Sequence, residues 1–265
     1  MIDLFKALKI MEQAAIDAGR LLTKMQPKSR RLESRKDFLT DADLESEQAI
    51  LSVLEAEYPE ITSFSEEQGG IMTDGYLWVI DPIDGTINFF LGDSHWGVSI
   101  ALVKRQQTIA GVVYLPANKQ LFSASCDTPT KLRIVDSEDE EINLHVNNET
   151  NLINSQFWFG WGKEDCGGED HRKVCEAMAK LDRQTLYPQI RNSATADMMM
   201  VAWGKIHGYV FLKPEPFDIA AAGLIIERAG GSVTDQNGHP WNAFSSSLIA
   251  SNGILHEKLL SVINT

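Results

Sequence analysis

The sequence contains few cysteines, and their placement excludes two kinds of cross-linked site. Only three occur in 265 residues, at positions 126, 166 and 175. An odd number of widely spaced cysteines does not build a disulfide framework and fits reduced thiols in a cytoplasmic protein. The surrounding segment EDCGGEDHRKVC also lacks the ligand spacing of a zinc site. We therefore expect neither a disulfide-stabilised fold nor a structural zinc ion.

Positive charge is also scarce. The chain has 24 Lys and Arg against 37 Asp and Glu, which gives a formal net charge of −13. A polyanion gains nothing from counterion release on DNA or RNA, and it is a poor match for an anionic membrane surface. Nucleic acid is therefore not expected as the principal ligand. The acidity is typical of a solvated surface and equally of a protein that collects divalent cations.

Long apolar runs are missing as well. The first 25 residues form an amphipathic stripe interrupted by charges, without the basic start and apolar centre of a secretory signal. No apolar run approaches the roughly 20 residues that a membrane-spanning helix needs. We expect a cytoplasmic protein without a membrane segment. Its apolar fraction of 43% is enough for a substantial core.

The spacing of apolar residues predicts helices first, then a β-rich centre, then an alternating second half. A helix is expected over 4–25, an exposed basic loop over 26–43, and a second helix over 44–58 with Thr40 or Asp41 near its N-cap. Residues 96–125 are typical of an antiparallel meander. The acidic run 136–151 separates this part from alternating strands (153–161, 185–191, 209–212, 246–252) and helices (170–183, 193–208, 216–231, 254–264). This alternation indicates a layered α/β arrangement.

The stretch DPIDGT, residues 81–86, places two aspartates three positions apart after a strand-like run. Pro82 fixes the backbone between them, and Gly85 allows another group to approach closely. Two carboxylates a few ångströms apart repel each other unless a cation lies between them. Oxygen ligands select hard ions, of which Mg²⁺ is the default. On this motif alone, a metal site and a structural turn explain the residues equally well.

Other acidic residues have adequate structural explanations when each is taken alone. Glu66 and Glu67 follow a β-like run, in SEEQGG. Asp218 lies in the first turn of an expected helix, where the helix dipole favours an anion. Asp43 is placed to cap the second helix. None of these positions indicates a metal by itself.

Taken in order, these segments resemble the inositol monophosphatase superfamily of metal-dependent, lithium-sensitive phosphatases. WVIDPIDGTINF is similar to the first motif of that family and FDIAAAGLIIERAGG to the second. KDFLTDADLESEQAI and YPEITSFSEEQGG follow the N-terminal order of the family, so the resemblance runs from Lys36 to the final helix. It implies an α/β fold layered α-β-α-β-α, in two intimate halves at 1–140 and 141–265. It also implies a homodimer, which is frequent among relatives.

The resemblance further implies a set of ligands for two or three Mg²⁺ ions. These would be the carbonyl of Ile83 and the side chains of Glu66, Asp81, Asp84 and Asp218. Thr86, with Asp43 behind it, would orient and help deprotonate a metal-bound water. The amides of Gly85 and Thr86 would hold a phosphate oxygen. Ala194 would line the substrate pocket beside Asp84 and Asp218, and the segment that carries Lys36 would close over the metals unless it is a plain surface loop.

The implied reaction is hydrolysis of a phosphate monoester by water. Such a reaction needs a metal to make a nucleophile near neutral pH and to neutralise the leaving alkoxide, because the motifs contain no histidine or lysine as an acid. No cysteine, serine or histidine nucleophile is implied.

The identity of the ester depends on positions where the chain departs from the family. Phe211 stands where inositol phosphatases commonly carry a glutamate that holds ring hydroxyls, and Ala194 stands where glycine is expected. Ile87 follows Thr86, where the histidinol-phosphate and nucleotide-bisphosphate branches more often carry lysine. Inositol 1-phosphate therefore leads as substrate, with histidinol phosphate, fructose 1,6-bisphosphate and adenosine 3′,5′-bisphosphate as alternatives. Some bacterial relatives are partners of the transcription machinery, so an interaction role is an alternative of another class.

Overall fold

The computed structural model of this chain describes residues 2–26, 35–137, 141–162 and 167–264. Within these residues no helix has the length and apolarity needed to cross a membrane. The elements follow in the order α1 (Leu4–Met25), α2 (Arg35–Glu57), β1 (Thr62–Ser65), β2 (Gly69–Gly70), β3 (Tyr76–Asp84), α3 (Thr86–Leu91), β4 (Gly97–Lys104), β5 (Gln107–Leu115), β6 (Gln120–Ser125), β7 (Thr128–Ile134), β8 (Ile142–Asn143), β9 (Phe157–Trp161), α4 (Glu169–Asp182), α5 (Ala194–Ala202), β10 (Gly208–Leu212), α6 (Pro216–Arg228), β11 (Ser232–Thr234), β12 (Ser247–Ser251) and α7 (His256–Ile263).

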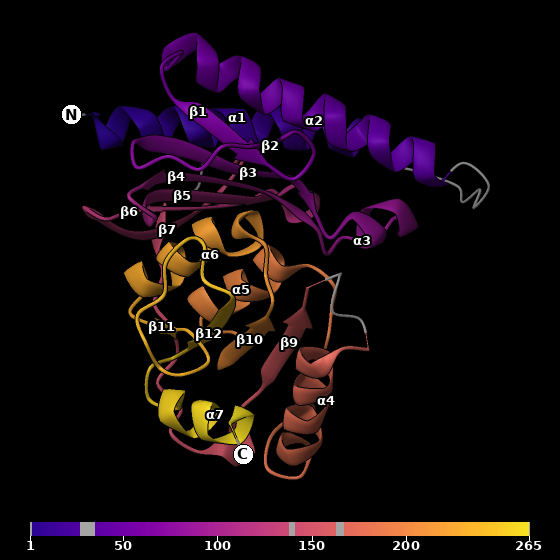
Figure 1. The fold of residues 1–265 in the computed structure, drawn as a ribbon, viewed down its shortest axis with the longest axis vertical. Helices are drawn as coiled ribbons and strands as arrows, with labels where there is room; N and C mark the ends of the chain where they lie inside the picture. Colours follow the sequence, from indigo (N-terminus) through magenta and orange to yellow (C-terminus); the bar gives the residue numbers. More distant parts are fainter. Residues whose placement is uncertain (1, 27–34, 138–140, 163–166, 265) are drawn as a thin grey trace.

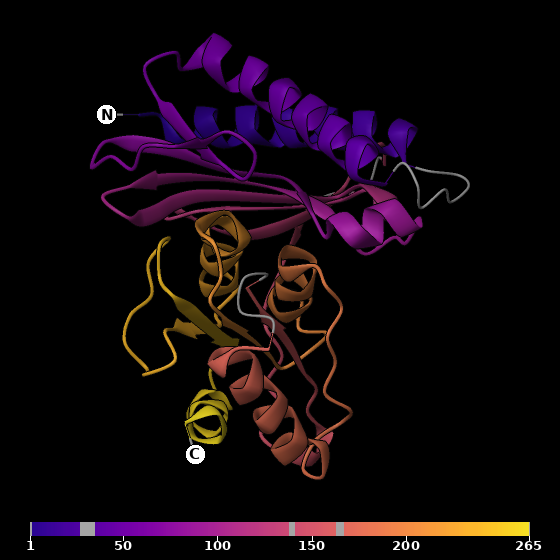
Figure 2. The same ribbon diagram turned by 45° about the vertical axis from the view of Figure 1, so that its right-hand side comes forward.

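The elements stack in five layers, which confirms the expected α-β-α-β-α arrangement (Figure 1). Helices α1 and α2 cover one face of a sheet with strand order β2-β1-β3-β4-β5-β6-β7-β8. Helices α5 and α6 lie between that sheet and a second one, ordered β11-β12-β10-β9. Helices α4 and α7 cover the far face of the second sheet, as the turned view in Figure 2 also shows. Each layer thus buries an apolar face against the next.

Three apolar clusters fill the spaces between the layers. One joins α1 and α2 to the outer face of the first sheet, with Trp78 and Ile100 fully buried. The largest surrounds α5 and α6 and includes residues from both sheets. The third lies between the second sheet and the outer helices α4 and α7. Because the largest cluster touches both sheets, the middle helices hold the two sheets in a fixed relation.

Strand β3 runs through the centre of the first sheet and carries DPIDGT at its end. It pairs in parallel with β1 and antiparallel with β4, so all of its residues after Tyr76 are buried. Its register against β4 shifts between Asp81 and Asp84, at Pro82, whose ring nitrogen has no proton to donate to the ladder. The two aspartates therefore lie on an irregular strand end, where the sequence predicts a loop.

The antiparallel meander is confirmed: β4, β5, β6 and β7 each pair antiparallel with the next. In the second half, β9 and β10 pair in parallel, and α4, α5 and α6 occupy the positions at which the sequence predicts helices. The boundary at residue 140 between two halves stays a prediction.

Two expectations about local structure are wrong. The second helix begins at Arg35 instead of Leu44, since the segment 35–43 has no glycine or proline and contains good helix formers. Thr40 and Asp41 are thus inside α2, Lys36 lies on that helix, and residues 27–34 of the expected basic loop lie outside the described residues. The expected strand over 185–191 is also absent: Pro188 has no donor, Tyr187 has a positive φ of 30°, and only an isolated bridge joins Gln189 to Trp158.

Candidate metal centre

Three carboxylates meet between the first sheet and the middle helices. Asp81, Asp84 and Asp218 each offer an oxygen, and these oxygens all lie within 4.8 Å of one another. Asp81 and Asp84 come from the end of β3, and Asp218 comes from the first turn of α6. The two β3 aspartates are buried, and Asp218 is half-buried. The fold therefore joins two of the candidate sites that are far apart in the sequence.

Asp84 is held by the beginning of α5. Its Oδ2 accepts hydrogen bonds from the Ser193 hydroxyl at 2.5 Å, the Thr195 amide at 2.9 Å and the Thr195 hydroxyl at 2.6 Å. Its Oδ1 accepts one from the Ala194 amide at 3.1 Å. The first amides of a helix have no partners within the helix and favour an anion. This carboxyl group is therefore fixed in one orientation by donors from α5.

The backbone around Asp81 is organised by short local contacts. Asp81 Oδ1 accepts from the Ile83 amide at 3.0 Å, and the Thr86 hydroxyl donates to the Ile83 carbonyl at 3.1 Å. From α2, the Ser46 hydroxyl donates to the Pro82 carbonyl at 3.0 Å. The Ile83 carbonyl, one of the expected metal ligands, thus lies within the same small loop as both aspartates.

Asp218 caps its own helix. Its Oδ2 accepts from the Glu215 amide at 2.7 Å, and the Glu215 side chain accepts in return from the Asp218 amide, which forms a capping box. Pro216 supplies the first helical residue without a donor to satisfy. The structural explanation for Asp218 and its membership of the carboxylate cluster are therefore compatible.

The other expected site residues lie in neighbouring elements. Glu66 follows β1, and its amide donates to the Ile80 carbonyl at 3.3 Å, next to Asp81. Its side chain is half-buried and is not a member of the three-carboxylate group found among the described residues. Asp43 is buried on α2. The roles expected for Glu66, Asp43 and Thr86 stay predictions.

Gly85 is required by its position. It has a left-handed φ of 84°, and a Cβ there would lie 2.9 Å from the Ser193 Cβ and 3.1 Å from the His95 carbonyl oxygen. Ala194, by contrast, is a helical residue at the start of α5 and needs no glycine. The left-handed conformation in this segment belongs to Asn192, with φ of 58°. The alanine is therefore no obstacle to the local fold.

A further buried acid, Asp197, lies one turn along α5, and the sequence did not single it out. Asp197 Oδ1 is 2.6 Å from His95 Nε2, while its Oδ2 is buried without a hydrogen-bond partner among the described atoms. Burial raises the pKa of Asp197 to about 6, opposed mainly by the hydrogen bond with His95. Burial also raises the pKa of Tyr209 well above its usual value, with smaller contributions from the nearby charges of Asp197, Asp84 and Asp218. The centre thus combines buried carboxylates from β3 and α5 with the half-buried Asp218.

The residues fit a hard divalent cation. All the candidate donors are oxygens, from carboxylates and the Ile83 carbonyl, and no cysteine or histidine belongs to the group. Converging buried carboxylates repel one another, so a cation between them would remove an unfavourable interaction. Asp81, Asp84 and Asp218 are the side chains that the geometry supports as ligands.

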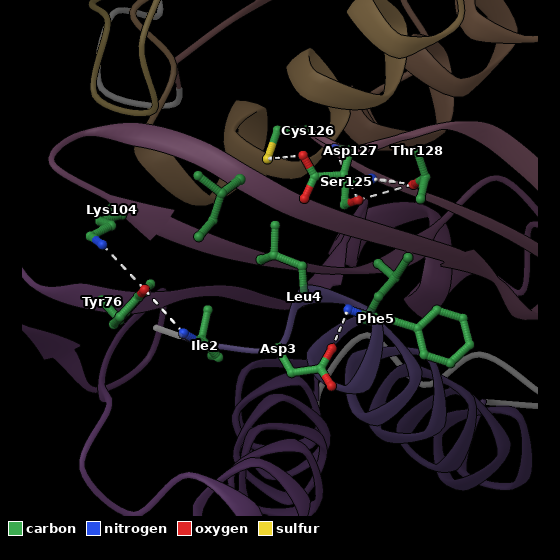
Figure 3. A pocket seen from close by; sticks show the side chains of 12 residues that line it. Ile2, Asp3, Leu4, Phe5, Tyr76, Lys104, Ser125, Cys126, Asp127 and Thr128 are labelled. Atoms are coloured by element: carbon green, nitrogen blue, oxygen red, sulfur yellow. Dashed lines mark hydrogen bonds between the residues drawn. The ribbon is translucent and has the colours of Figure 1, made fainter.

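A pocket elsewhere on the molecule is separate from this centre. Figure 3 shows it at the start of α1, beside the ends of β3, β4, β6 and β7. Here Tyr76 accepts from Lys104 at 3.2 Å and from the Ile2 amide at 3.3 Å. None of the clustered carboxylates lines this pocket. It has no evident connection to the chemistry of the metal centre.

Comparisons with known proteins cover nearly the whole chain. A sequence profile described as "Inositol monophosphatase family" matches residues 3–265. A protein of Thermotoga maritima named fructose-1,6-bisphosphatase/inositol-1-monophosphatase is 31% identical over 234 residues, which is 86% of this chain and 83% of that protein. A protein of Pasteurella multocida named Nus factor SuhB is 31% identical over 262 residues, 97% of this chain and 95% of that one. The solved inositol monophosphatase of Anabaena (Nostoc) sp. PCC 7120 superposes with a TM-score of 0.85 at 26% identity, covering 99% of this chain and 97% of its own.

Proposed function

Because the chain belongs to the inositol monophosphatase family, whose members hydrolyse phosphate monoesters, we propose that it is a Mg²⁺-dependent phosphatase of small-molecule esters. The observation that carries this proposal is the meeting of Asp81, Asp84 and Asp218 within 4.8 Å. The sequence expectation of Glu66 and the Ile83 carbonyl as further ligands is part of the proposal. Two or three ions would be held.

When bound, the ions would supply an activated water and would neutralise the leaving alkoxide. The residues of the chain would orient the metal ligand, the attacking water and the phosphate. Asp84 is locked by its four hydrogen bonds, so its free lone pairs keep one direction. The Thr86 hydroxyl, which donates to the Ile83 carbonyl in this structure, would orient the attacking water and relay its proton to the Asp43 carboxylate. The Gly85 and Thr86 amides would bind a phosphate oxygen, beside Ala194.

Inositol 1-phosphate is the leading substrate in this proposal. Phe211 is buried and packs against Tyr209, with ring centroids 6.0 Å apart, so it offers no polar partner to a ring hydroxyl. We therefore expect little discrimination between esters, since rejection of analogues depends on partnered polar groups. Histidinol phosphate, fructose 1,6-bisphosphate and adenosine 3′,5′-bisphosphate remain the alternatives.

The test is a phosphate-release screen over these four esters and glycerol 2-phosphate, with Mg²⁺ or with EDTA. Hydrolysis should require Mg²⁺, and kcat/KM for inositol 1-phosphate should be no better than for glycerol 2-phosphate. LiCl should inhibit more than NaCl at equal ionic strength. Hydrolysis that persists after exhaustive chelation contradicts the metal proposal. A hundredfold preference for inositol 1-phosphate contradicts the expectation that Phe211 leaves the ring hydroxyls without a polar partner.

A second candidate is a role with the transcription machinery. The observation that favours it is the likeness to the relative named Nus factor SuhB, which spans 97% of this chain. A pull-down from cell extract would test it, with RNA polymerase recovered at stoichiometric levels as the supporting result. We also propose that the protein is a cytoplasmic homodimer. Light scattering of the purified protein would check its dimeric state.

A further inference from the structure

The donors that fix Asp84 do not belong to the same part of the chain as Asp84. Ser193 and Thr195 lie 109 and 111 residues downstream, at the start of α5, whereas Asp84 ends β3. If α5 shifted away from β3, the carboxyl group would lose all four of its hydrogen bonds together. The orientation of one metal ligand therefore depends on whatever holds the first turn of α5 against the β3–α3 loop.

Two contacts hold it there, one on each side of the Asp84 donors. Asn88, on α3, donates from Nδ2 to the Arg191 carbonyl at 2.7 Å and to the His95 carbonyl at 2.7 Å. His95, in the loop before β4, binds Asp197 through Nε2 at 2.6 Å. Arg191 precedes the α5 donors and Asp197 follows them. We call Asn88, His95 and Asp197 the clamp.

The His95–Asp197 contact of the clamp is largely shielded from solvent, whereas the contact of Asn88 with the Arg191 carbonyl is exposed. The side chain of Asp197 is 1% exposed and that of His95 is 12% exposed, so water does not compete strongly for either. The His95 ring is also fixed edge-on against Trp158, with centroids 6.1 Å apart. The His95 amide donates to Asp93 at 2.9 Å, which holds the loop itself. A hydrogen bond to a charged group in such surroundings is stronger and more orienting than one at the surface.

We propose that Asn88, His95 and Asp197 are positioning residues that set the affinity of the metal centre by holding the start of α5 against Asp84. None of them touches the carboxylate cluster as a ligand. They act through Ser193, Ala194 and Thr195, which in turn orient Asp84. This inference rests on the proposed metal-dependent function. Partners that orient metal ligands typically change metal affinity by about 10- to 100-fold when they are removed.

The experiment measures Mn²⁺ binding to the full-length protein without substrate, by the EPR signal of free Mn²⁺. In His95→Ala and Asn88→Ala, the Mn²⁺ dissociation constant should rise about 10-fold. His95→Gln keeps a side-chain amide able to donate to Asp197 and should bind Mn²⁺ within about twofold of wild type. Hydrolysis at saturating metal should recover much of the wild-type kcat, so that the defect lies in the metal requirement.

His256 supplies the matched control. It is a buried histidine, hydrogen-bonded to Thr234 at 2.9 Å and Ser251 at 2.9 Å as His95 is to Asp197, but it lies at the start of α7, on the far side of the second sheet (Figure 1). His256→Ala should lower the melting temperature and leave Mn²⁺ binding unchanged. If His95→Ala does not fold, because it leaves Asp197 buried alone, Asn88→Ala still tests the clamp.

The outcomes separate this inference from the function on which it rests. Wild-type Mn²⁺ binding with weaker binding in the clamp variants alone supports the clamp. Wild-type binding with unchanged clamp variants overturns it, and so does equal weakening in His256→Ala, which would reveal general destabilisation. If the wild-type protein binds no Mn²⁺, the proposed metal centre fails and the clamp fails with it.

Discussion

At the scale of single residues, the carboxyl group of Asp84 has two neighbours with opposite effects. Its four hydrogen bonds stabilise the negative charge, while Asp81 and Asp218 close by disfavour it. A side chain in this position contributes to the fold through the hydrogen bonds that it accepts and to metal binding through its charge. Substitution by the amide of equal size separates these contributions.

We predict that Asp84→Asn lowers Mg²⁺-dependent hydrolysis by at least about a hundredfold, because the metal loses a charged ligand. The melting temperature in EDTA should change little. The amide cannot accept at both ends, but the loss of hydrogen bonding is offset by relief of repulsion among the carboxylates. Rates with Mg²⁺ and paired thermal melts without it are the measurements. Asp127→Asn, at an exposed site, is the control; a melt lowered by many degrees would show that Asp84 is a structural residue.

Asp197 gives a prediction about pH. Burial raises its pKa from 3.8 to about 6, so between these values the folded protein holds a proton that the unfolded chain has released. Its contribution to stability is therefore complete below pH 3.8 and is lost as the pH rises through about 6. A shift of this size corresponds to about 3 kcal/mol. The free energy of unfolding of wild type relative to Asp197→Asn should fall between pH 4 and pH 6.5.

Urea unfolding in EDTA at constant ionic strength measures this difference. The variant cannot titrate at position 197, so the contributions of acids elsewhere cancel in the difference between the two free energies of unfolding. Arg191 and His95 oppose the shift, and the charge of Asp84 adds to it. Parallel stability curves for the two proteins over this range would mean that the carboxyl group of Asp197 does not titrate there.

At the scale of elements, the start of α5 depends on an unusual backbone conformation just before it. Asn192 has a φ of 58°, and its carbonyl oxygen is 3.5 Å from the side-chain Nδ2 of Asn88. Asparagine tolerates the left-handed region better than most residues, and glycine tolerates it without penalty. The turn at Asn192 directs the chain so that Ser193 and Thr195 face Asp84.

We predict that Asn192→Ala lowers the free energy of unfolding by about 1 kcal/mol and that Asn192→Gly is close to neutral. Alanine has a Cβ that disfavours this φ and has no side chain for local hydrogen bonding, whereas glycine removes the steric cost. Chemical unfolding of the three proteins in EDTA is the measurement. Equal destabilisation by alanine and glycine would assign the effect to the lost asparagine side chain instead of to the backbone.

At the scale of the whole molecule, the carboxylate cluster joins two layers. Asp81 and Asp84 belong to the first sheet, and Asp218 belongs to the helices between the sheets. An ion bound by all three contacts both layers and has no equivalent site in the unfolded chain. Binding to the native state alone stabilises it by mass action.

We therefore predict that Mg²⁺ raises the free energy of unfolding, by about 2.7 kcal/mol at a hundredfold excess over its dissociation constant. Thermal melts with MgCl₂, compared with NaCl at equal ionic strength, give the measurement. Asp218→Asn should reduce the increase, because it removes the ligand from α6. The same increase in Asp218→Asn and wild type would place the stabilising ion elsewhere.

Several features could be predicted because they depend on neighbours in the chain. The capping box of Glu215 and Asp218 is encoded within four residues, and Pro82 and Gly85 determine the backbone between and after the two aspartates. The helices and the meander follow from periodicity. Family resemblance supplied the order of layers. The start of α2 and the segment 185–191 differ from the sequence prediction, because a charged segment without glycine or proline can be helical and because Pro188 removes a donor from a strand ladder.

By itself, the sequence determined the local chemistry of this protein: paired carboxylates at a strand end, an acid in the first turn of a helix, and amphipathic elements able to form layers. Only the tertiary structure decided which of these groups meet. Asp218 reaches Asp81 and Asp84, α5 supplies the donors to Asp84, and His95 finds Asp197 across 102 residues. Local patterns are governed by backbone geometry within a turn or two, whereas these meetings require the layers to pack. Packing depends on the shapes of whole buried faces, which no short stretch of sequence contains.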